Sequence, residues 1–155
     1  MSKSDSDHEI EIVNRKAKFQ YFFDQTFEAG IQLTGTEIKS IRTGEANLND
    51  AYCNFERGEL YVRSLFIAEY KYGNQQNHDT RRARKLLLKR NELKKLEKKL
   101  KEKGYTLIPY MLYINHRGLA KLEIALARGK KSFDKRESIK QKDQKRDMDR
   151  SVKYN

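Results

Sequence analysis

Two pairs of apolar segments, each joined by a short polar turn that contains glycine, constrain the fold of this chain more than any other feature. Residues 52–55 and 60–63 flank the polar sequence ERGE, and residues 105–114 and 119–127 flank the polar sequence NHRG. Short apolar runs separated by such turns are typical of antiparallel hairpins. We therefore predict two β-hairpins, and with them a mainly antiparallel sheet.

One strand of the second hairpin has a clear facial pattern. Leu122, Ile124 and Leu126 alternate with Lys121 and Glu123. Successive side chains of a strand point to opposite faces. We therefore expect the aliphatic side chains in the core and the two charged side chains on the outer face.

Alternation also precedes the first hairpin. Aromatic residues recur within residues 18–23, the pattern continues at residues 31–33, and Gly35 separates it from Ile38 and Ile41, which are out of phase. A glycine at such a break is typical of a bulge or sharp bend, as small barrels use to turn corners. The sequence thus predicts a mainly β fold with two or three helices, a small OB-like β-barrel of about six strands. The length of the chain allows one such domain, which we place at residues 14–131.

The region between the hairpins predicts the main helix. Four leucines recur at helical spacing in the basic segment 81–103: Leu86, Leu93, Leu96 and Leu100. A break near Leu88 is equally compatible with the sequence, because Asn91 is a suitable N-cap for a second helix. One helix and two helices both remain open. A weaker signal marks a short helix at residues 47–51.

The two ends of the chain differ from this domain. Residues 1–13 are polar and acidic, and we expect them to be disordered. Residues 132–155 form a basic tail whose apolar side chains are too few to offset an ordering cost of ~1–2 kcal/mol per residue, so the free tail is expected to be disordered. The tail contains no proline or glycine, and it is therefore also compatible with a helix that forms on a charged partner. A solvated tail without a special role is the alternative.

Positive charge is concentrated in two segments. The net charge is +12; residues 81–103 hold twelve Lys or Arg against three Glu, and residues 129–155 hold ten against five acidic residues. Such an excess indicates a polyanionic partner, either nucleic acid or an anionic membrane surface. The longest nearly apolar stretch, residues 107–114, is too short to span a bilayer. Binding to a membrane surface would need a larger apolar face than the leucines of residues 86–100 supply. We therefore expect nucleic acid as the partner and no membrane role.

The residues that enzymes need are not grouped in this sequence. His8, His78 and His116 have no partner at metal or triad spacing, and no phosphate-binding glycine loop occurs. Cys53, the lone cysteine, fits a core position and a reducing compartment, and the acidic N-terminus is not a signal peptide. The sequence predicts a cytoplasmic protein that is not an enzyme, with no catalytic residues, no metal and no cofactor. An RNA-modifying enzyme with a basic tail is the alternative from another class.

A cluster of cations at residues 81–85, with the sequence RRARK, is the strongest local signal for nucleic acid. Four cations in five residues repel one another unless they are solvated or bound to phosphates. A solvated helix face is therefore one interpretation, and phosphate contact by Arg82, Arg84 and Lys85 is the other. Contacts of this kind supply affinity without reading base sequence.

The chain as a whole resembles the SmpB family, the SsrA (tmRNA)-binding proteins of bacterial trans-translation. The matching motifs follow one another along the chain: NRKA at 14–17, FEAGIQLTGTEIKSIR at 27–42, NLNDAY at 47–52, RARKLLL at 82–88, GYTLIP at 104–109 and KLEIALARGKKSFDKRESIK at 121–140. One such motif would be a weak signal, whereas the ordered series is specific.

The resemblance implies an adaptor without catalytic activity. Such an adaptor has an OB-like barrel that binds the tRNA-like domain of tmRNA and helps to deliver it, with elongation factor Tu and GTP, to stalled 70S ribosomes. The barrel takes the place of the anticodon side of a tRNA. The tail is disordered when free and becomes helical in the empty mRNA channel near the decoding centre of the small subunit. The outcome is nascent-peptide tagging and ribosome rescue, and we expect the protein to act as a monomer.

The resemblance also implies the residues that bind tmRNA. Glu28, Leu87 and Lys121 match family positions important for this binding, although a core role for Leu87 remains open. Further RNA contacts are expected in front of the barrel, on the segment after Gly35, and at the exit from the barrel: Asn14, Arg15, Lys16, Lys39, Arg42, Gly129, Lys130 and Lys131.

Six residues of the tail are expected to serve the ribosome rather than tmRNA: Phe133, Asp134, Lys135, Arg136, Ile139 and Lys140. Two positions depart from the family pattern. Phe133 stands where relatives often have histidine or tyrosine, so stacking on a base is retained but an imidazole charge is not. Gln144 stands where some relatives have tryptophan, which removes an aromatic anchor.

Overall fold

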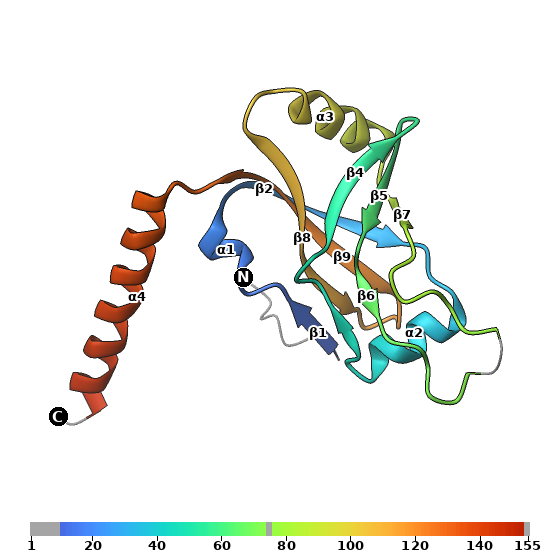
Figure 1. Cartoon of the computed structure of the whole chain (residues 1–155), viewed down its shortest axis with the longest axis horizontal. Helices are drawn as coiled ribbons and strands as arrows, with labels where there is room; N and C mark the ends of the chain where they lie inside the picture. The colour runs from blue at the N-terminus through green and yellow to red at the C-terminus, as the bar shows by residue number, and fades with distance from the viewer. Residues whose placement is uncertain (1–9, 74–75, 154–155) are drawn as a thin grey trace.

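The structure, a computed structural model, describes residues 10–73 and 76–153 (Figure 1). The described elements, in chain order, are β1 (Ile10–Val13), α1 (Ala17–Gln20), β2 (Tyr21–Ile31), α2 (Gly35–Arg42), β3 (Ala46–Asn47), β4 (Tyr52–Glu56), β5 (Glu59–Arg63), β6 (Phe66–Ile67), β7 (Arg84–Leu87), α3 (Arg90–Leu100), β8 (Tyr105–Ile114), β9 (Ala120–Gly129) and α4 (Ser132–Lys153).

Seven of these strands form one antiparallel sheet in the order β1-β8-β9-β2-β7-β5-β4, and β3 pairs with β6 in a separate ribbon. The sheet curls until β4 lies against β8, but no backbone ladder between described strands closes it (Figure 1). The predicted class, mainly β with helices, is confirmed. The OB-like barrel takes the form of a curled, open sheet of seven strands, and the described chain has four helices rather than two or three.

The interior of the curl is an apolar core. Its fully buried members come from both predicted hairpins and from the flanking elements: Ile41, Leu60, Val62, Leu86, Leu96, Leu112, Leu122 and Ile124. Both hairpins are present, as β4–β5 and β8–β9. The first turns at Arg57 and Gly58, with φ of 53° and 78°, the two positive values that a two-residue hairpin turn of type I′ requires.

Residues 35–42 form a helix, α2, where the sequence suggested a bend between strands. The helix begins after Thr34, whose backbone N–H donates to the Glu37 carboxylate at 2.8 Å. This Thr-x-x-Glu arrangement satisfies a free N–H at the helix start. Ile38 and Ile41, three residues apart, face the core from one side of the helix. The break in the alternation at Gly35 therefore marks the change from a strand to a helix and not a bulge.

The leucine-rich segment is neither one helix nor two. Residues 84–87 form strand β7, which pairs with β2 and β5, and α3 begins only at Arg90 after the N-cap residue Lys89. Leu86 reaches the core from the strand, whereas Leu93 and Leu96 reach it from the helix. The spacing of seven between Leu86 and Leu93 therefore spans two elements. Residues 47–51 are likewise not helical, since they contain the end of β3 and a turn.

The N-terminal region also differs from the expectation. Residues 10–13 of the predicted disordered segment form β1, which pairs with β8 from Ile10 opposite Ile114 to Val13 opposite Met111; residues 1–9 lie outside the described part. Within the predicted strand 18–23, the first residues belong to helix α1, and β2 begins at Tyr21. Burial of Ala17 against the sheet accounts for this turn of helix.

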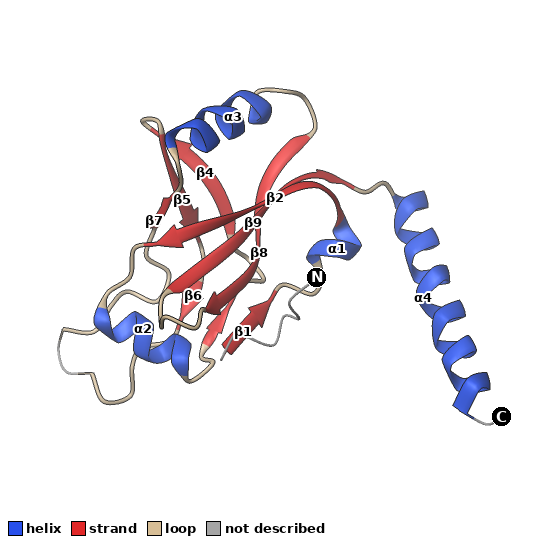
Figure 2. Cartoon of the chain, turned by 180° about the vertical axis from the view of Figure 1, so that it is seen from behind, coloured by secondary structure: helices blue, strands red, loops and turns tan. Residues whose placement is uncertain are grey.

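The described part of the tail is a single helix, α4, which projects away from the sheet (Figure 2). That the tail is disordered when free stays a prediction. The residues of α4 are mostly good helix formers, and neither glycine nor proline interrupts them. Its large apolar side chains Phe133, Ile139 and Met148 are exposed, so the helix gains little free energy from packing.

A buried ion pair connects α2 to β7. The Arg84 guanidinium donates through Nε to the carboxylate of Glu37, and both side chains are fully buried. Arg84 also donates to the Leu65 carbonyl at 2.7 Å, and Arg82 donates to the other carboxylate oxygen of Glu37 at 2.7 Å. One carboxylate therefore compensates two arginines and fixes the start of β7.

Replacement of Glu37 by Gln keeps the side-chain shape but removes the charge that compensates Arg84. Because a buried cation is then left without its partner, we expect the free energy of unfolding at neutral pH to fall by about 3–5 kcal/mol, measured by denaturant titration. Glu56→Gln is the matched control, because it removes an exposed pair with Arg63 (2.6 Å). The control should cost at most about 1 kcal/mol. Equal losses in the two variants would contradict this role.

The same experiment has a pH signature. Burial raises the pKa of Glu37, but hydrogen bonds from Arg82, from the Thr34 N–H and from Arg84 outweigh burial, so the pKa is lowered from its ordinary value of 4.5. The stabilisation is then complete above that ordinary value and is lost as the pH falls through the lower pKa of the folded protein. The Glu37→Gln protein should therefore lose less stability in acid than the unchanged protein, and parallel pH profiles would argue against the pair.

Candidate nucleic-acid interface

A row of residues crosses four strands on one face of the sheet. Tyr113 on β8 lies opposite Lys121 on β9, Lys121 lies opposite Gly30 on β2, and Gly30 lies opposite Leu87 on β7. Directly opposed residues of antiparallel strands present their side chains to the same face. We call these four residues the sheet-face row. They come from four separate segments, and only the sheet brings them together.

Leu87 is the apolar member of the row. Its side chain is 47% exposed, which resolves the alternative left open by the sequence in favour of a surface position. A side-chain Cβ at Gly30 would lie 3.2 Å from the Leu87 Cβ, so glycine at this position allows Leu87 to lie close to β2.

Glu28 lies beside the row. It is exposed on β2 opposite Glu123, and its carboxylate accepts a hydrogen bond from the Tyr113 hydroxyl. Burial, this hydrogen bond and the charges of Glu28 and Glu123 all raise the pKa of Tyr113. Tyr113 therefore stays protonated and holds the Glu28 carboxylate in place, while the remaining lone pairs of the carboxylate can accept further hydrogen bonds.

A shallow pocket of about 240 Å³ adjoins the row. Its walls are mainly apolar, with Leu33, Ile38, Leu87 and Leu119, and Lys121 lies at its edge. Arg42 lies close to this pocket, because a side chain at Gly118 would come within 3.9 Å of its Nη2 atom. An apolar surface with cations at its border can accept the flat face of a base or a sugar while the cations bind phosphate.

The positive charges of the RRARK cluster are paired with acidic side chains of the protein itself. The prediction that Arg84 contacts a phosphate is wrong. Arg84 is buried on Glu37 and cannot contact a phosphate. Arg82 shares Glu37, and Lys85 lies 3.5 Å from the Glu59 carboxylate. Arg81 lies 4.0 Å from the Asp50 carboxylate. The repulsion inferred from the sequence is thus relieved by three acids distant along the chain. Arg82 and Lys85 are partly exposed and remain predicted phosphate contacts.

The remaining predicted RNA contacts fall at several places. Asn14 is buried, with its N–H donating to the Tyr110 carbonyl at 2.8 Å, so its side chain has little surface to offer. Arg15 and Lys16 are exposed before α1. Lys39 on α2 lies over the ring of Tyr70, with its Nζ 5.3 Å from the ring centroid.

The exit from the sheet is a separate basic region. Gly129 ends β9, and the Lys130 ammonium lies over the ring of Phe22 (4.8 Å) and donates to the Ser138 hydroxyl at 2.8 Å. The Lys131 N–H donates to the Asp134 carboxylate at 3.2 Å at the start of α4. The other predicted tail residues, Phe133, Lys135, Arg136, Ile139 and Lys140, lie on α4. The structure therefore does not join these residues to the sheet-face row.

Three kinds of group that catalytic sites often use have other surroundings here. Among the described residues, no group of three His, Cys, Asp or Glu side chains could hold a metal ion. Burial raises the pKa of the Cys53 thiol, which opposes a role as nucleophile. His78 is a structural residue, with its Nδ1 2.9 Å from the Thr36 hydroxyl and its Nε2 2.9 Å from the Ile67 carbonyl. Within the part of the chain that the structure describes, no helix combines the length and apolar character needed to cross a bilayer.

Comparison with known proteins decides the family. The family model described as SmpB protein matches residues 11–154. The chain belongs to the SmpB family. An SsrA-binding protein of Phocaeicola vulgatus is 58% identical over 144 residues, which cover 93% of this chain and 96% of the relative. An SsrA-binding protein of Moorella thermoacetica is 49% identical over 140 residues, 90% of each chain.

A solved structure supports the same conclusion. A chain from the work "tmRNA-SmpB: a journey to the center of the bacterial ribosome" is similar with a TM-score of 0.68 and 46% sequence identity. The match covers 83% of this chain and 94% of that chain. The SmpB resemblance inferred from the ordered motifs is therefore confirmed.

The sequence interpretation missed Tyr113 and Gly30 as members of the site. The hairpin pattern located Tyr113 near this site but not in its register: a four-residue turn at residues 115–118 would pair it with Ala120, whereas the observed loop of residues 115–119 pairs it with Lys121. Gly30 pairs with Leu87, which is 57 residues away in the sequence. No sequence pattern near either residue predicts this pairing.

Proposed function

We propose that this chain binds the tRNA-like domain of tmRNA through the sheet-face row and Glu28, and that it acts as the adaptor that brings tmRNA to stalled ribosomes. The observation that carries the proposal is the convergence of Glu28, Leu87 and Lys121 on one face of the sheet from three separate strands. The relatives named SsrA-binding proteins and the structural neighbour in a tmRNA context support the same role.

The three side chains supply different contacts to a folded RNA. Leu87 offers an exposed apolar surface for a base or a ribose, and Lys121 offers a charge for a phosphate. Glu28 carries the charge that RNA would ordinarily repel. Since Tyr113 holds its carboxylate, Glu28 can accept hydrogen bonds from ribose hydroxyls or base amino groups, which distinguishes RNA shapes rather than mere charge.

The tail has a separate role in this proposal. Lys121 lies near the start of β9 and α4 follows its end at Gly129, a distance of about 25 Å at the usual rise of a strand. The tail can therefore enter the empty mRNA channel of the small subunit while the sheet face holds tmRNA. A helix without a packed face forms at little net free energy in isolation, so contacts with ribosomal RNA are what stabilise it there.

Other parts of the proposal follow from the two partners. Elongation factor Tu with GTP acts on the aminoacylated tmRNA, so its association with this chain is indirect. The protein acts as a monomer that takes the place of the anticodon side of a tRNA. It acts in the cytoplasm, because its ribosomal partner is there. The outcome is tagging of the nascent peptide and release of the ribosome.

Leu87→Ala tests the sheet face directly. Loss of one apolar contact to RNA should weaken the binding of tmRNA by about tenfold, or ~1.4 kcal/mol, which is less than the ~1.5–3 kcal/mol for full burial of an aliphatic side chain. Ile139→Ala on α4 is the matched control, because Leu87 and Ile139 are both 47% exposed and neither supports the core. The control should bind tmRNA as the unchanged protein does in a gel-shift titration. Equal affinities of all three proteins would show that RNA does not contact this face.

Deletion of residues from Asp134 onward tests the division of labour. The sheet face and its supports lie entirely before this point, so the affinity for tmRNA should change by less than about threefold, a difference under ~1 kcal/mol. Peptide tagging on stalled ribosomes should be abolished in a reconstituted translation assay. A truncated protein that lost tmRNA binding and tagging to the same degree would contradict a separate role for the tail.

A further inference from the structure

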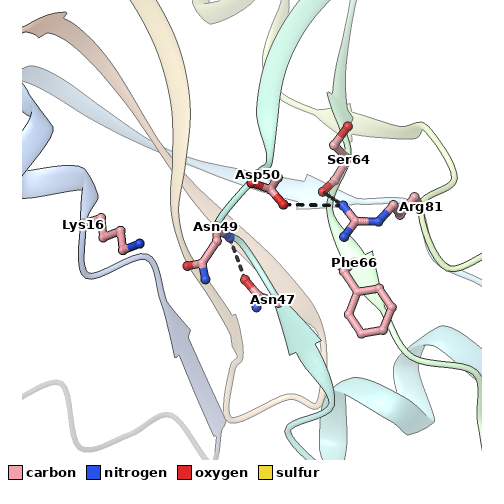
Figure 3. Close-up of a pocket in the computed structure, with 7 residues that line it drawn as sticks. All are labelled: Lys16, Asn47, Asn49, Asp50, Ser64, Phe66 and Arg81. Carbon is pink, nitrogen blue, oxygen red and sulfur yellow. Dashed lines mark hydrogen bonds and ion pairs between the residues drawn. The ribbon is translucent and has the colours of Figure 1, made fainter.

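A second pocket lies away from the sheet-face row, between the connection from β1 to α1 and the strands β3 and β6 (Figure 3). Its volume is about 430 Å³, and it shares no lining residue with the pocket beside Leu87. The proposed contact with tmRNA through the sheet face makes no use of it.

One wall of this pocket is a planar cation held on an aromatic ring. The Arg81 guanidinium lies over Phe66, with its Cζ 5.6 Å from the ring centroid, and its Nη1 donates to the Ser64 carbonyl at 3.3 Å. Asp50 lies 4.0 Å from the same nitrogen. The Arg81 side chain is nevertheless 51% exposed, so this ordered plane is available to a ligand. Guanidinium planes on aromatic rings are surfaces on which unpaired bases stack.

The backbone of the same wall is strained. Ser64 has a φ of 58°, in the left-handed region that non-glycine residues seldom adopt. The carbonyl of this residue accepts the hydrogen bond from Arg81. Strain retained in this manner often marks a position where a side chain must be held for a ligand.

The other groups around the pocket can read a base and bind its phosphate. Asp50 presents a 76% exposed carboxylate, which accepts hydrogen bonds only. Asn47 accepts a hydrogen bond from the Asn49 N–H at 2.7 Å through Oδ1, which orients its amide nitrogen as a donor. Lys16 lies on the opposite side of the pocket from Arg81 (Figure 3).

We propose that this pocket binds one unpaired guanosine nucleotide of an RNA, independently of the sheet face. The base stacks on the Arg81 plane, the Asp50 carboxylate accepts from the N1–H and N2–H of guanine, and Lys16 binds the phosphate. Guanine is the standard base with two adjacent donors on its pairing edge, the pattern that matches a carboxylate. A bare phosphate can pair with the Arg81 N–H groups but cannot stack on their plane, and the Asp50 carboxylate repels it. A nucleotide therefore fits the pocket better than an inorganic anion.

The test is a titration of the isotopically labelled full chain with GMP, AMP and inorganic phosphate, followed by ¹H–¹⁵N correlation spectra. GMP should shift the resonances of Asn47, Asn49, Ser64 and Arg81 at millimolar concentrations. AMP should bind at least about fivefold more weakly, the smallest effect expected from loss of a base-edge pair. Inorganic phosphate should shift the Arg81 side chain much less than GMP does at the same concentration.

Four variants locate the effect. Asp50→Asn should bring the affinity for GMP down to that for AMP, and Arg81→Lys should weaken both nucleotides, because it keeps the charge but removes the plane. Asp149→Asn on α4 is the control for a lost carboxylate and should change neither affinity. Leu87→Ala should also bind GMP unchanged, which separates this site from the sheet face.

The opposite results would overturn the proposal. Absence of shifts at the pocket at millimolar GMP would exclude the site. Equal shifts with inorganic phosphate would show a simple anion site, and equal affinities for GMP and AMP in the unchanged protein would exclude recognition by Asp50.

Discussion

The buried ion pair between Arg84 and Glu37 is the interaction on which the arrangement of the functional face depends. It joins the start of β7 to α2 and to the loop that carries Leu65. In a strand, alternate residues face the same way. With Arg84 and Leu86 directed inward, Lys85 and Leu87 must face outward. A charged residue in the interior therefore determines that an apolar residue lies on the surface, where RNA can contact it.

The cost of burying this charge explains why the surrounding network is extensive. An isolated buried cation would be strongly unfavourable, and even a paired one contributes to stability only when its hydrogen-bonding groups are satisfied. Here a carboxylate and several backbone carbonyls surround the Arg84 guanidinium. Some of the basic residues at positions 81–85 thus stabilise the fold. The positive charge available to RNA is therefore smaller than the number of Lys and Arg residues implies.

The sequence predicted those features whose causes are local. Polar turns with glycine specify the two hairpins, and alternation on β9 places Lys121 outside and Leu122 inside. Features that depend on distant partners could not be read in this way. The acid that compensates Arg84 is 47 positions away, and the four-residue strand β7 exists because β2 and β5 lie on either side of it. The leucine spacing therefore favoured a helix that the sheet overrides. The Thr34–Glu37 cap was a local signal for α2 that the alternation pattern obscured.

In the proposed function, a specific surface, and not the net charge of +12 alone, selects the RNA partner. Competition at fixed salt tests it most directly: labelled tRNA-like domain of tmRNA is bound to the full chain and displaced with unlabelled RNA. Binding by phosphate contacts alone cannot discriminate between RNAs of similar size and charge. We expect unlabelled tmRNA domain to displace the label at equimolar concentration, whereas bulk tRNA should require an excess of at least about a hundredfold, or ~3 kcal/mol. Displacement by bulk tRNA at the same concentration as by tmRNA would contradict it.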